Sequence, residues 1–132
     1  MVQQPPPAAP GRDYPRPCAH PILYESDLQS LGATDEDVDV GPVPQGEYWR
    51  IEHAATEDLT TASTEVRIGI VRSSVFVPLQ EQEAPSAARL YWADRPIHLS
   101  TGDRLRARWT GTTSGDRLRL YVNGVSMLAG GA

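Results

Sequence analysis

Three histidines are the residues best suited to acid–base catalysis in this sequence, because imidazole exchanges protons near neutral pH. His20 lies between an alanine and a proline in a proline-rich stretch, which is a poor place for a preorganised catalytic group. His53 continues the apolar side of an alternating segment, and His98 lies between two apolar residues of another. We therefore expect both to be histidines of the protein core rather than catalytic residues.

Motifs that carry other kinds of chemistry are absent. The sequence contains no Gly-x-Ser-x-Gly elbow, no His-Glu-x-x-His pair, no phosphate-binding loop and no dinucleotide-binding glycine pattern. Cys18 is the single cysteine, so an internal disulfide is excluded, and a structural zinc site usually needs several such ligands. The acidic run at 35–39 lacks the glycine and terminal glutamate of a helix–loop–helix calcium site, and we interpret it as a solvated linker. We predict a protein that is not an enzyme and has no catalytic residue, metal or cofactor.

The last two alternating segments carry arginines on their polar sides. If these segments pair as strands, the arginines gather on one surface, which we call the arginine face: Arg104, Arg106, Arg108, Arg117 and Arg119. Like charges opposite one another are destabilising, so this face needs an acidic counterpart. We expect the acidic N-terminal arm, of the same copy or of a neighbour, to lie across it. Local pairing of the arginines with Asp103 and Asp116 is the alternative.

The aromatic residues divide into two groups. Trp49 and Trp109 fall on the apolar sides of alternating segments and are expected in the core. Tyr91 and Trp92 precede a turn at 94–96, where they could contact a sugar or another subunit.

These residues must be positioned by β-strands, because apolar and polar residues alternate from residue 47 onward. Turn-type residues separate the segments, and neither a helical period nor a repeat is visible. The pattern predicts an all-β fold, an antiparallel β-sandwich, with a jelly roll as one form of it. The expected strands are 47–54, 65–71, 75–79, 90–92, 97–99, 103–109 and 117–122.

The N-terminal part is expected to be an extended arm. Five of the twelve prolines fall within residues 1–15, and proline disfavours both helix interiors and central strands. Ser26 and Gln29 match a capping box and predict one helical turn. The arm's apolar cluster is expected to bind a partner: Ile22, Leu23, Tyr24, Leu28 and Leu31. We therefore divide the chain into an extended, proline-rich N-terminal arm or anchor (1–40), a β-sandwich domain (41–128) and a flexible tail (129–132).

Charge and hydropathy exclude two classes of partner. Residues 1–66 contain twelve acids and three arginines, whereas residues 67–132 contain five acids and nine arginines. Halves of opposite sign suit pairing within or between subunits, and the net charge of −5 opposes nucleic-acid binding. No segment approaches the ~20 apolar residues that span a membrane, and no signal peptide is recognisable. We expect synthesis in the cytoplasm, with no nucleic acid and no membrane as partner.

Two stretches carry a resemblance to a known class of protein. Residues 41–51 read G-P-V-P-x-G-x-x-W-x-I, and residues 96–111 read P-I-x-L-x-x-G-D-x-L-x-x-x-W-T-G. Together they resemble small virion-associated proteins of tailed bacteriophages with GC-rich hosts. The resemblance runs from Val40 to about Val122, implies a structural role on the particle, and assigns no catalytic residue.

The function implied is that of a capsid decoration or cement protein. The β-sandwich would project from the shell while the N-terminal arm anchors it, and many weak contacts would add up through symmetry. The expected partners are the major capsid protein or other virion proteins, together with further copies of the chain in a homo-oligomer, a trimer by preference. The protein would be made in the host cytoplasm and located in the virion. The alternatives are a neck or tail accessory or fibre-attachment protein, and a carbohydrate-binding β-sandwich module.

Overall fold

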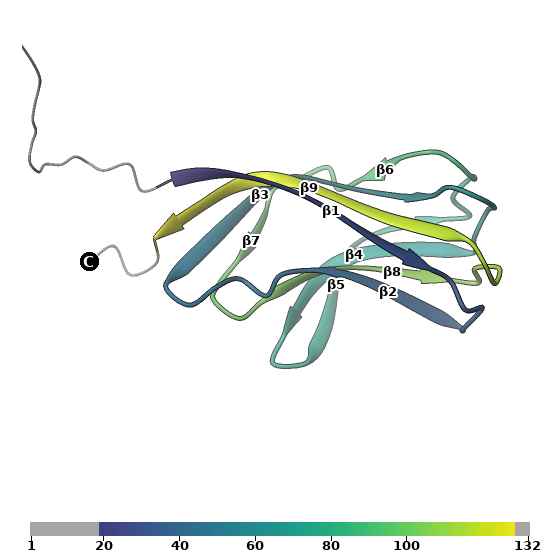
Figure 1. The fold of residues 1–132 in the computed structure, drawn as a ribbon, viewed down its shortest axis with the longest axis horizontal. Coiled ribbons are helices and arrows are strands. Elements are labelled where there is room, and N and C mark those ends of the chain that lie inside the picture. Colours follow the sequence, from purple (N-terminus) through teal and green to yellow (C-terminus); the bar gives the residue numbers. More distant parts are fainter. Residues whose placement is uncertain (1–18, 129–132) are drawn as a thin grey trace, which may run out of the picture.

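The computed structural model describes residues 19–128 of the chain. Every regular element in that range is a β-strand, and the strands form two antiparallel sheets packed face to face (Figure 1). The prediction of an antiparallel β-sandwich is therefore confirmed. None of the described residues belongs to a helix long and apolar enough to cross a membrane.

The first sheet has the strand order β1-β9-β3-β6, and β7 pairs with the same edge of β3 as β6. Its strands are β1 (Ala19–Gln29), β9 (Arg117–Leu128), β3 (Glu47–Asp58), β6 (Tyr91–Trp92) and β7 (Ile97–Leu99). The second sheet has the order β2-β8-β4-β5. Its strands are β2 (Asp35–Val40), β8 (Arg104–Thr110), β4 (Glu65–Arg72) and β5 (Val75–Glu83).

This strand order is that of a jelly roll. Strands β1 to β4 alternate between the two sheets, and in each sheet an early strand pairs with a late one, β1 with β9 and β2 with β8. The short strands β6 and β7 together fill one strand position beside β3. The sandwich is therefore wound by strands that are far apart in the sequence.

The core lies between the sheets and follows the predicted alternation. Trp49 and Trp109 are buried, as expected. The inward side chains of the last two strands are also buried: Leu105, Ala107, Trp109, Leu118, Leu120 and Val122. Each large apolar side chain removed from water in this way contributes about 1.5–3 kcal/mol before the entropy of ordering is counted.

The boundary expected at residue 40 is wrong, because residues 19–40 supply two strands of the sandwich. β1 pairs with β9 along its whole length, so the helical turn expected at Ser26 is a strand instead. The acidic run is strand β2 rather than a linker, because Glu36, Val38 and Val40 point inward while the intervening aspartates point outward. Of the expected arm, residues 1–18 lie outside the described residues, as does the tail at 129–132.

The expected pairing of the last two strands is also wrong. β8 belongs to one sheet and β9 to the other, and the loop between Thr110 and Arg117 crosses from sheet to sheet. Each strand has better-matched neighbours, since β8 lies between β2 and β4 and β9 lies between β1 and β3. The arginines of the two strands consequently lie on opposite outer faces of the sandwich.

Candidate functional site

The two histidines expected in the core are both exposed. A β-bulge between Ile51 and His53 shifts the alternation of β3, so that His53 points outward. His98 lies on the outer side of β7, where its Nδ1 forms a hydrogen bond with the Tyr48 hydroxyl. In the described part of the chain, no group of three or more His, Cys, Asp or Glu side chains could hold a metal ion.

The arginines of β8 are paired with the acids of β2. Arg106 donates two hydrogen bonds to Asp39, from Nε to Oδ1 at 2.8 Å and from Nη2 to Oδ2 at 2.9 Å. Arg108 donates to Asp37 in the same way, at 2.8 and 3.1 Å, and its guanidinium carbon lies 4.7 Å from the centre of the Phe76 ring. The hydrogen bonds with these aspartates raise the pKa of both arginines. These are bidentate pairs, which are stronger than single surface ion pairs.

The arginines of β9 are paired with the acids of β1. Arg119 Nε lies 2.9 Å from Asp27 and 3.3 Å from Glu25, and Arg117 reaches Asp27 at 3.4 Å. Acids of residues 19–40 therefore pair with four of these arginines within one copy, but as neighbouring strands of each sheet rather than as an arm lying across one face. A single arginine face is not formed, and Arg104 has no ion pair among the described residues.

The alternative of local pairing for these arginines is wrong as well. Asp103 is engaged by Arg72 of β4, whose Nη2 lies 2.6 Å from Oδ2. Asp116 accepts hydrogen bonds from the Thr61 hydroxyl and the Thr113 N–H instead of from an arginine.

The apolar cluster expected to bind a partner is divided by the strand geometry of β1. Ile22 and Leu28 pack against the core, whereas Leu23 and Leu31 are 80% and 85% exposed. Tyr24 stacks on Trp49 with ring centres 5.3 Å apart and remains 41% exposed. The cluster is thus not one contact surface, because alternate residues of a strand point to opposite faces.

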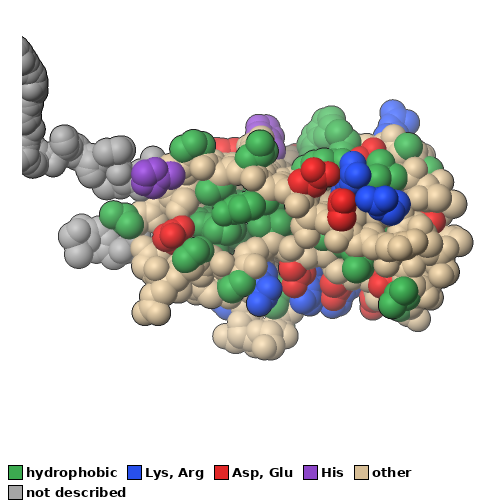
Figure 2. Space-filling view, viewed as in Figure 1, with side chains coloured by type: hydrophobic (Ala, Val, Ile, Leu, Met, Phe, Trp, Pro, Cys, Tyr) green, Lys and Arg blue, Asp and Glu red, His purple; other side chains and the backbone are tan. Residues whose placement is uncertain are grey.

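A hollow of about 330 Å³ lies beside Tyr24, along the seam between β1 and β2, and we call it the Tyr24 groove. The residues that line it include Tyr24, Ser26, Val40, Pro42, Pro44 and Trp49. Pro42 and Pro44 are exposed, whereas Val40 and Trp49 are buried and form the floor. Figure 2 shows hydrophobic side chains gathered in a hollow between the two layers of the molecule. This groove was not predicted from the sequence, because its residues come from β1, β2, β3 and the loop before β3.

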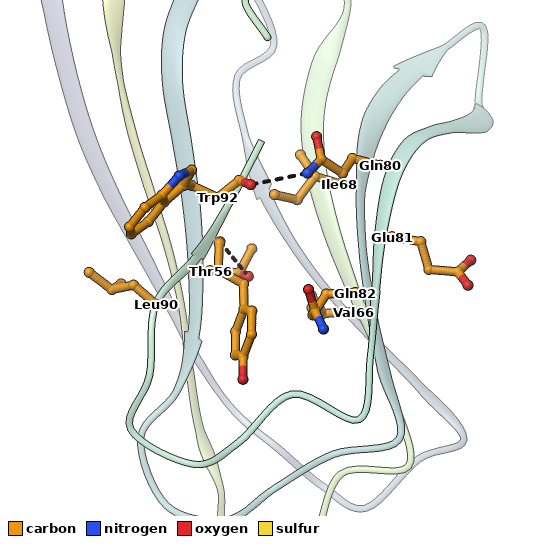
Figure 3. A pocket seen from close by; sticks show the side chains of 9 residues that line it. Thr56, Val66, Ile68, Gln80, Glu81, Gln82, Leu90 and Trp92 are labelled. Atoms are coloured by element: carbon orange, nitrogen blue, oxygen red, sulfur yellow. Dashed lines mark hydrogen bonds between the residues drawn. The ribbon is translucent and has the colours of Figure 1, made fainter. Parts of the chain in front are cut away.

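The opposite side of the sandwich, formed by β5 and residues 84–97, is the open side. A slot of about 240 Å³ opens there between the sheets, lined by Thr56, Val66, Ile68, Gln82 and Tyr91 among others. The Ser86 N–H donates to the Tyr91 hydroxyl, which lowers the pKa of Tyr91. A hydrogen bond connects β5 and β6 across the slot: the Gln80 side-chain amide donates to the Trp92 backbone carbonyl at 3.2 Å (Figure 3).

Tyr91 and Trp92, expected together as a contact for a sugar or a subunit, do not form one platform. Tyr91 is half-buried in the slot, and Trp92 is 61% exposed. Figure 3 shows the Trp92 ring and Leu90 on the side of β6 that points away from Val66 and Gln82. The two aromatic rings therefore present separate surfaces.

Strand β5 adds a row of exposed apolar side chains to the open side. Val75, Val77 and Leu79 are between 47% and 59% exposed, although each is a large apolar residue of a β-strand. β5 is an edge strand, because it pairs only with β4. This row was not predicted from the sequence, because β-strand alternation alone does not say whether a facing sheet is present.

A pair of buried carboxylates lies at one end of β3 and was also missed. Asp58 and Asp116 are 3% and 1% exposed. Asp58 Oδ1 accepts from the N–H groups of Thr60 and Thr61, but Oδ2 has no hydrogen-bond partner apart from the neighbouring carboxylate. Burial, together with Asp116, raises the pKa of Asp58 to about 6. Burial opposes ionisation of Asp116 too, but hydrogen bonds from Thr61 and Asp58 lower its pKa.

Comparison with known proteins gives limited information about this arrangement. No protein-family model matches the chain. The chain is similar to the spectinabilin polyketide synthase system protein NorB of Streptomyces orinoci, with 32% identity over 119 residues. The alignment covers 80% of this chain but only 5% of that protein, so the similarity concerns a small part of a much larger polypeptide.

Proposed function

We propose that this chain is a non-catalytic attachment module, a capsid decoration protein of a bacteriophage particle, whose open side is the contact surface. The observation that carries the proposal is the exposed apolar row of β5, formed by Val75, Val77 and Leu79. Trp92 is exposed on the same open side but presents a separate surface. Neighbouring apolar side chains exposed on one side of a domain are typical of a protein–protein contact.

The chemistry of the open side favours contact through side chains rather than through added strands. Val75, Val77 and Leu79 offer apolar surface, while Pro78 interrupts the row of backbone donors on the same edge. Glu81 and Glu83 follow at the end of β5, and charges on an edge strand oppose pairing with another sheet. A partner would therefore cover the open side as a face, with aromatic and aliphatic side chains entering the slot.

The fold and the sequence resemblance support the same proposal. Jelly rolls are common in viral capsid and lectin domains, although fold alone does not assign function. The motifs at 41–51 and 96–111, which resemble those of virion-associated proteins, form the loop before β3 and the segment from β7 to β8. Attachment to the major capsid protein in the virion, with several copies around a symmetry site, is the form of this function that we propose.

Immunogold labelling of particles carrying the chain tests the proposal. Gold over the head is the expected result, whereas gold at one vertex or on the tail would indicate a neck or tail accessory protein. The absence of gold from all particles would overturn the particle role.

A paired substitution tests the contact surface. Val77→Asp with Leu79→Asp should abolish attachment to particles that lack the protein, measured by co-sedimentation, because both charges would be buried in the contact. Leu23→Asp is the matched control, since Leu23 is 80% exposed on β1, at the other side of the sandwich. Equal attachment by the paired variant and the control would exclude the open side as the contact surface.

The similarity to a polyketide synthase system protein favours a second candidate. In that case the same attachment module would dock within a multienzyme synthase assembly rather than on a capsid. Co-precipitation of the chain with a synthase polypeptide of its own genome, lost in the Val77→Asp, Leu79→Asp variant, would support this candidate. Co-sedimentation with particles and no synthase partner would exclude it.

A further inference from the structure

We propose that the Tyr24 groove binds the proline-rich N-terminal segment, residues 1–18, of a second copy of the chain, so that copies are linked by exchanging arms. The groove lies on the side of the sandwich opposite the open side. The inference therefore does not depend on what the open side contacts, and it concerns self-assembly rather than attachment.

The groove has the surface chemistry that recognises proline. Tyr24 and Trp49 form a stacked aromatic pair, and Pro42 and Pro44 extend the apolar wall. Proline-rich peptides adopt the polyproline II helix without a large loss of entropy and dock into grooves lined with aromatic side chains.

The polar groups of the groove fit the same ligand. A polyproline II helix has no internal hydrogen bonds, so its carbonyl oxygens need donors from the receptor. The hydroxyls of Tyr24 and Ser26 lie on the wall formed by β1, and neither is used in a hydrogen bond to another described residue. Glu25, at the rim, has a half-exposed side chain that an arginine of the segment can approach, although its carboxylate also lies 3.3 Å from Arg119.

The N-terminal segment has the matching composition. Residues 1–18 contain six prolines, at 5, 6, 7, 10, 15 and 17. The segment carries Arg12 and Arg16 against one acid, whereas residues 19–132 carry sixteen acids and ten arginines. The segment and the domain are therefore of opposite net charge, which favours their association over repulsion between copies.

The direction of β1 favours exchange over docking within one copy. The strand begins at Ala19, and Tyr24 lies five residues further along it, or roughly 17 Å at the rise of a β-strand. The segment of the same copy would have to fold back before β1 to reach the groove, whereas the segment of a second copy can enter the groove without such a reversal. Eighteen residues of polyproline II would span about 56 Å, which is enough to reach a neighbouring groove.

Sedimentation equilibrium of the full chain and its variants tests the exchange. The wild-type chain should associate in a concentration-dependent way. Replacing Pro5, Pro6, Pro7 and Pro10 with alanine should raise the dissociation constant by at least about tenfold, and Tyr24→Ala should do the same. Leu23→Ala is the matched control, because Leu23 is the neighbour of Tyr24 that points away from the groove, and it should associate like the wild type.

A peptide titration separates arm binding from any effect on folding. The variant with alanine at positions 5, 6, 7 and 10 is unchanged in all nine described strands, so its groove has the same residues as that of the wild type. A synthetic peptide of residues 1–17 should bind it in isothermal titration calorimetry, and the same peptide with its prolines replaced by alanine should not. Association of the arm variant at wild-type strength, or equal binding of both peptides, would overturn the proposal. Equal binding of an unrelated proline-rich peptide without arginines would assign the groove to an external partner and overturn the exchange.

The two proposals fail in different ways. Loss of particle attachment in the open-side variant, with unchanged sedimentation, leaves the arm exchange standing. Loss of association in the Tyr24→Ala chain, with attachment of the single copy retained, leaves the attachment module standing.

Discussion

The two long sides of the sandwich end in different ways. On the side of β1 and β2, two edge strands of eleven and six residues lie beside β9 and β8, and their acids pair with four arginines. On the open side, β5 faces β6 and β7, which have only two and three residues. The first side is completed by residues of the same chain, whereas the second leaves apolar side chains in water.

The difference indicates how one small domain can provide both stability and a contact surface. Bidentate pairs between neighbouring strands fix the register of β2 on β8, because a shift by one residue would place aspartates in the core. No such constraint acts on β5, where a β-bulge between Ile68 and Gly69 already shifts the pairing. We therefore expect the strands on the side of β1 and β2 to shift less easily than β5, so that a substitution there lowers the free energy of unfolding more than one on the open side.

Two glycine substitutions give the largest expected effects and compare the two sides directly. A methyl group at Gly124 would overlap the Arg50 carbonyl oxygen on β3, in the interior of its sheet, and one at Gly69 would overlap the Val77 carbonyl oxygen on the edge strand β5. Gly124→Ala should lower the free energy of unfolding by about 3 kcal/mol or more, because β9 is held between two strands. Gly69→Ala should cost about 1 kcal/mol, because β5 can move away.

Urea denaturation followed by tryptophan fluorescence measures both losses. Equal losses for the two variants would contradict the comparison, because the open side would then be as rigid as the opposite one.

Asp58, which has no arginine partner among the described residues, should respond to pH in the opposite sense from ordinary paired acids. Because the pKa of Asp58 is raised to about 6 from an unfolded value near 3.8, the folded chain binds more protons than the unfolded chain between these pH values. The free energy of unfolding contributed by Asp58 therefore falls as pH rises through this window, by about 3 kcal/mol, and the loss persists at higher pH.

Asp58→Asn removes this titration and keeps an oxygen acceptor for the N–H groups of Thr60 and Thr61. Relative to the wild type, the variant should be more stable at pH 7 and lose that advantage at pH 4, measured by urea denaturation at each pH. Asp94→Asn, at an exposed carboxylate, is the control and should show no such crossover. A constant difference between the wild type and Asp58→Asn at all pH values would contradict the raised pKa.

Much of this fold could be predicted from alternation, and the errors have specific physical causes. Trp49 and Trp109 were placed in the core correctly because their strands alternate regularly. His53 was misplaced because a β-bulge, which no residue pattern announces, inverts the alternation after Ile51. Residues 19–40 were expected outside the domain, because prolines and acids masked a period of two in β1 and β2.

The sites were harder to predict than the strands. The opposite charges of the N-terminal acids and the arginines are visible in the sequence, but which residues pair depends on the order of strands in each sheet, which sequence proximity does not give. The Tyr24 groove and the open side both lie where two sheets meet, so their residues come from segments that are distant in the chain. Such places become visible only when the topology is known.

Removing one acid from each side, Asp37 on β2 and Glu81 on β5, should give the next largest difference in the free energy of unfolding. Asp37 accepts two hydrogen bonds from Arg108 and is 31% exposed in its side chain, so Asp37→Asn should lower the free energy of unfolding by about 1–2 kcal/mol. Glu81 on β5 forms an exposed pair with Arg67 at 3.0 Å, and Glu81→Gln should cost much less, because exposed single ion pairs contribute little to stability. Denaturation at low and high salt compares the two losses. If the two losses were equal at low salt, the bidentate pairs would not stabilise β2 more than a surface pair stabilises β5.

Removal of the Trp92 ring should have the smallest effect on stability and the clearest effect on binding. Because Trp92 is 61% exposed, Trp92→Ala should change the free energy of unfolding by less than about 0.5 kcal/mol, as should Leu128→Ala at an equally exposed position. If the open side is a protein contact, Trp92→Ala weakens attachment by roughly tenfold while Leu128→Ala does not, because exposed tryptophans are frequent anchors of interfaces.

A glycan array tests the remaining alternative, a carbohydrate-binding module. Sugar binding by the wild type that is lost in Trp92→Ala would make the open side a carbohydrate site, since an exposed indole can stack on a sugar ring. A loss of stability well above that of Leu128→Ala would instead mean that the ring packs within the domain, and the contrast between the two sides would then be smaller than its exposure implies.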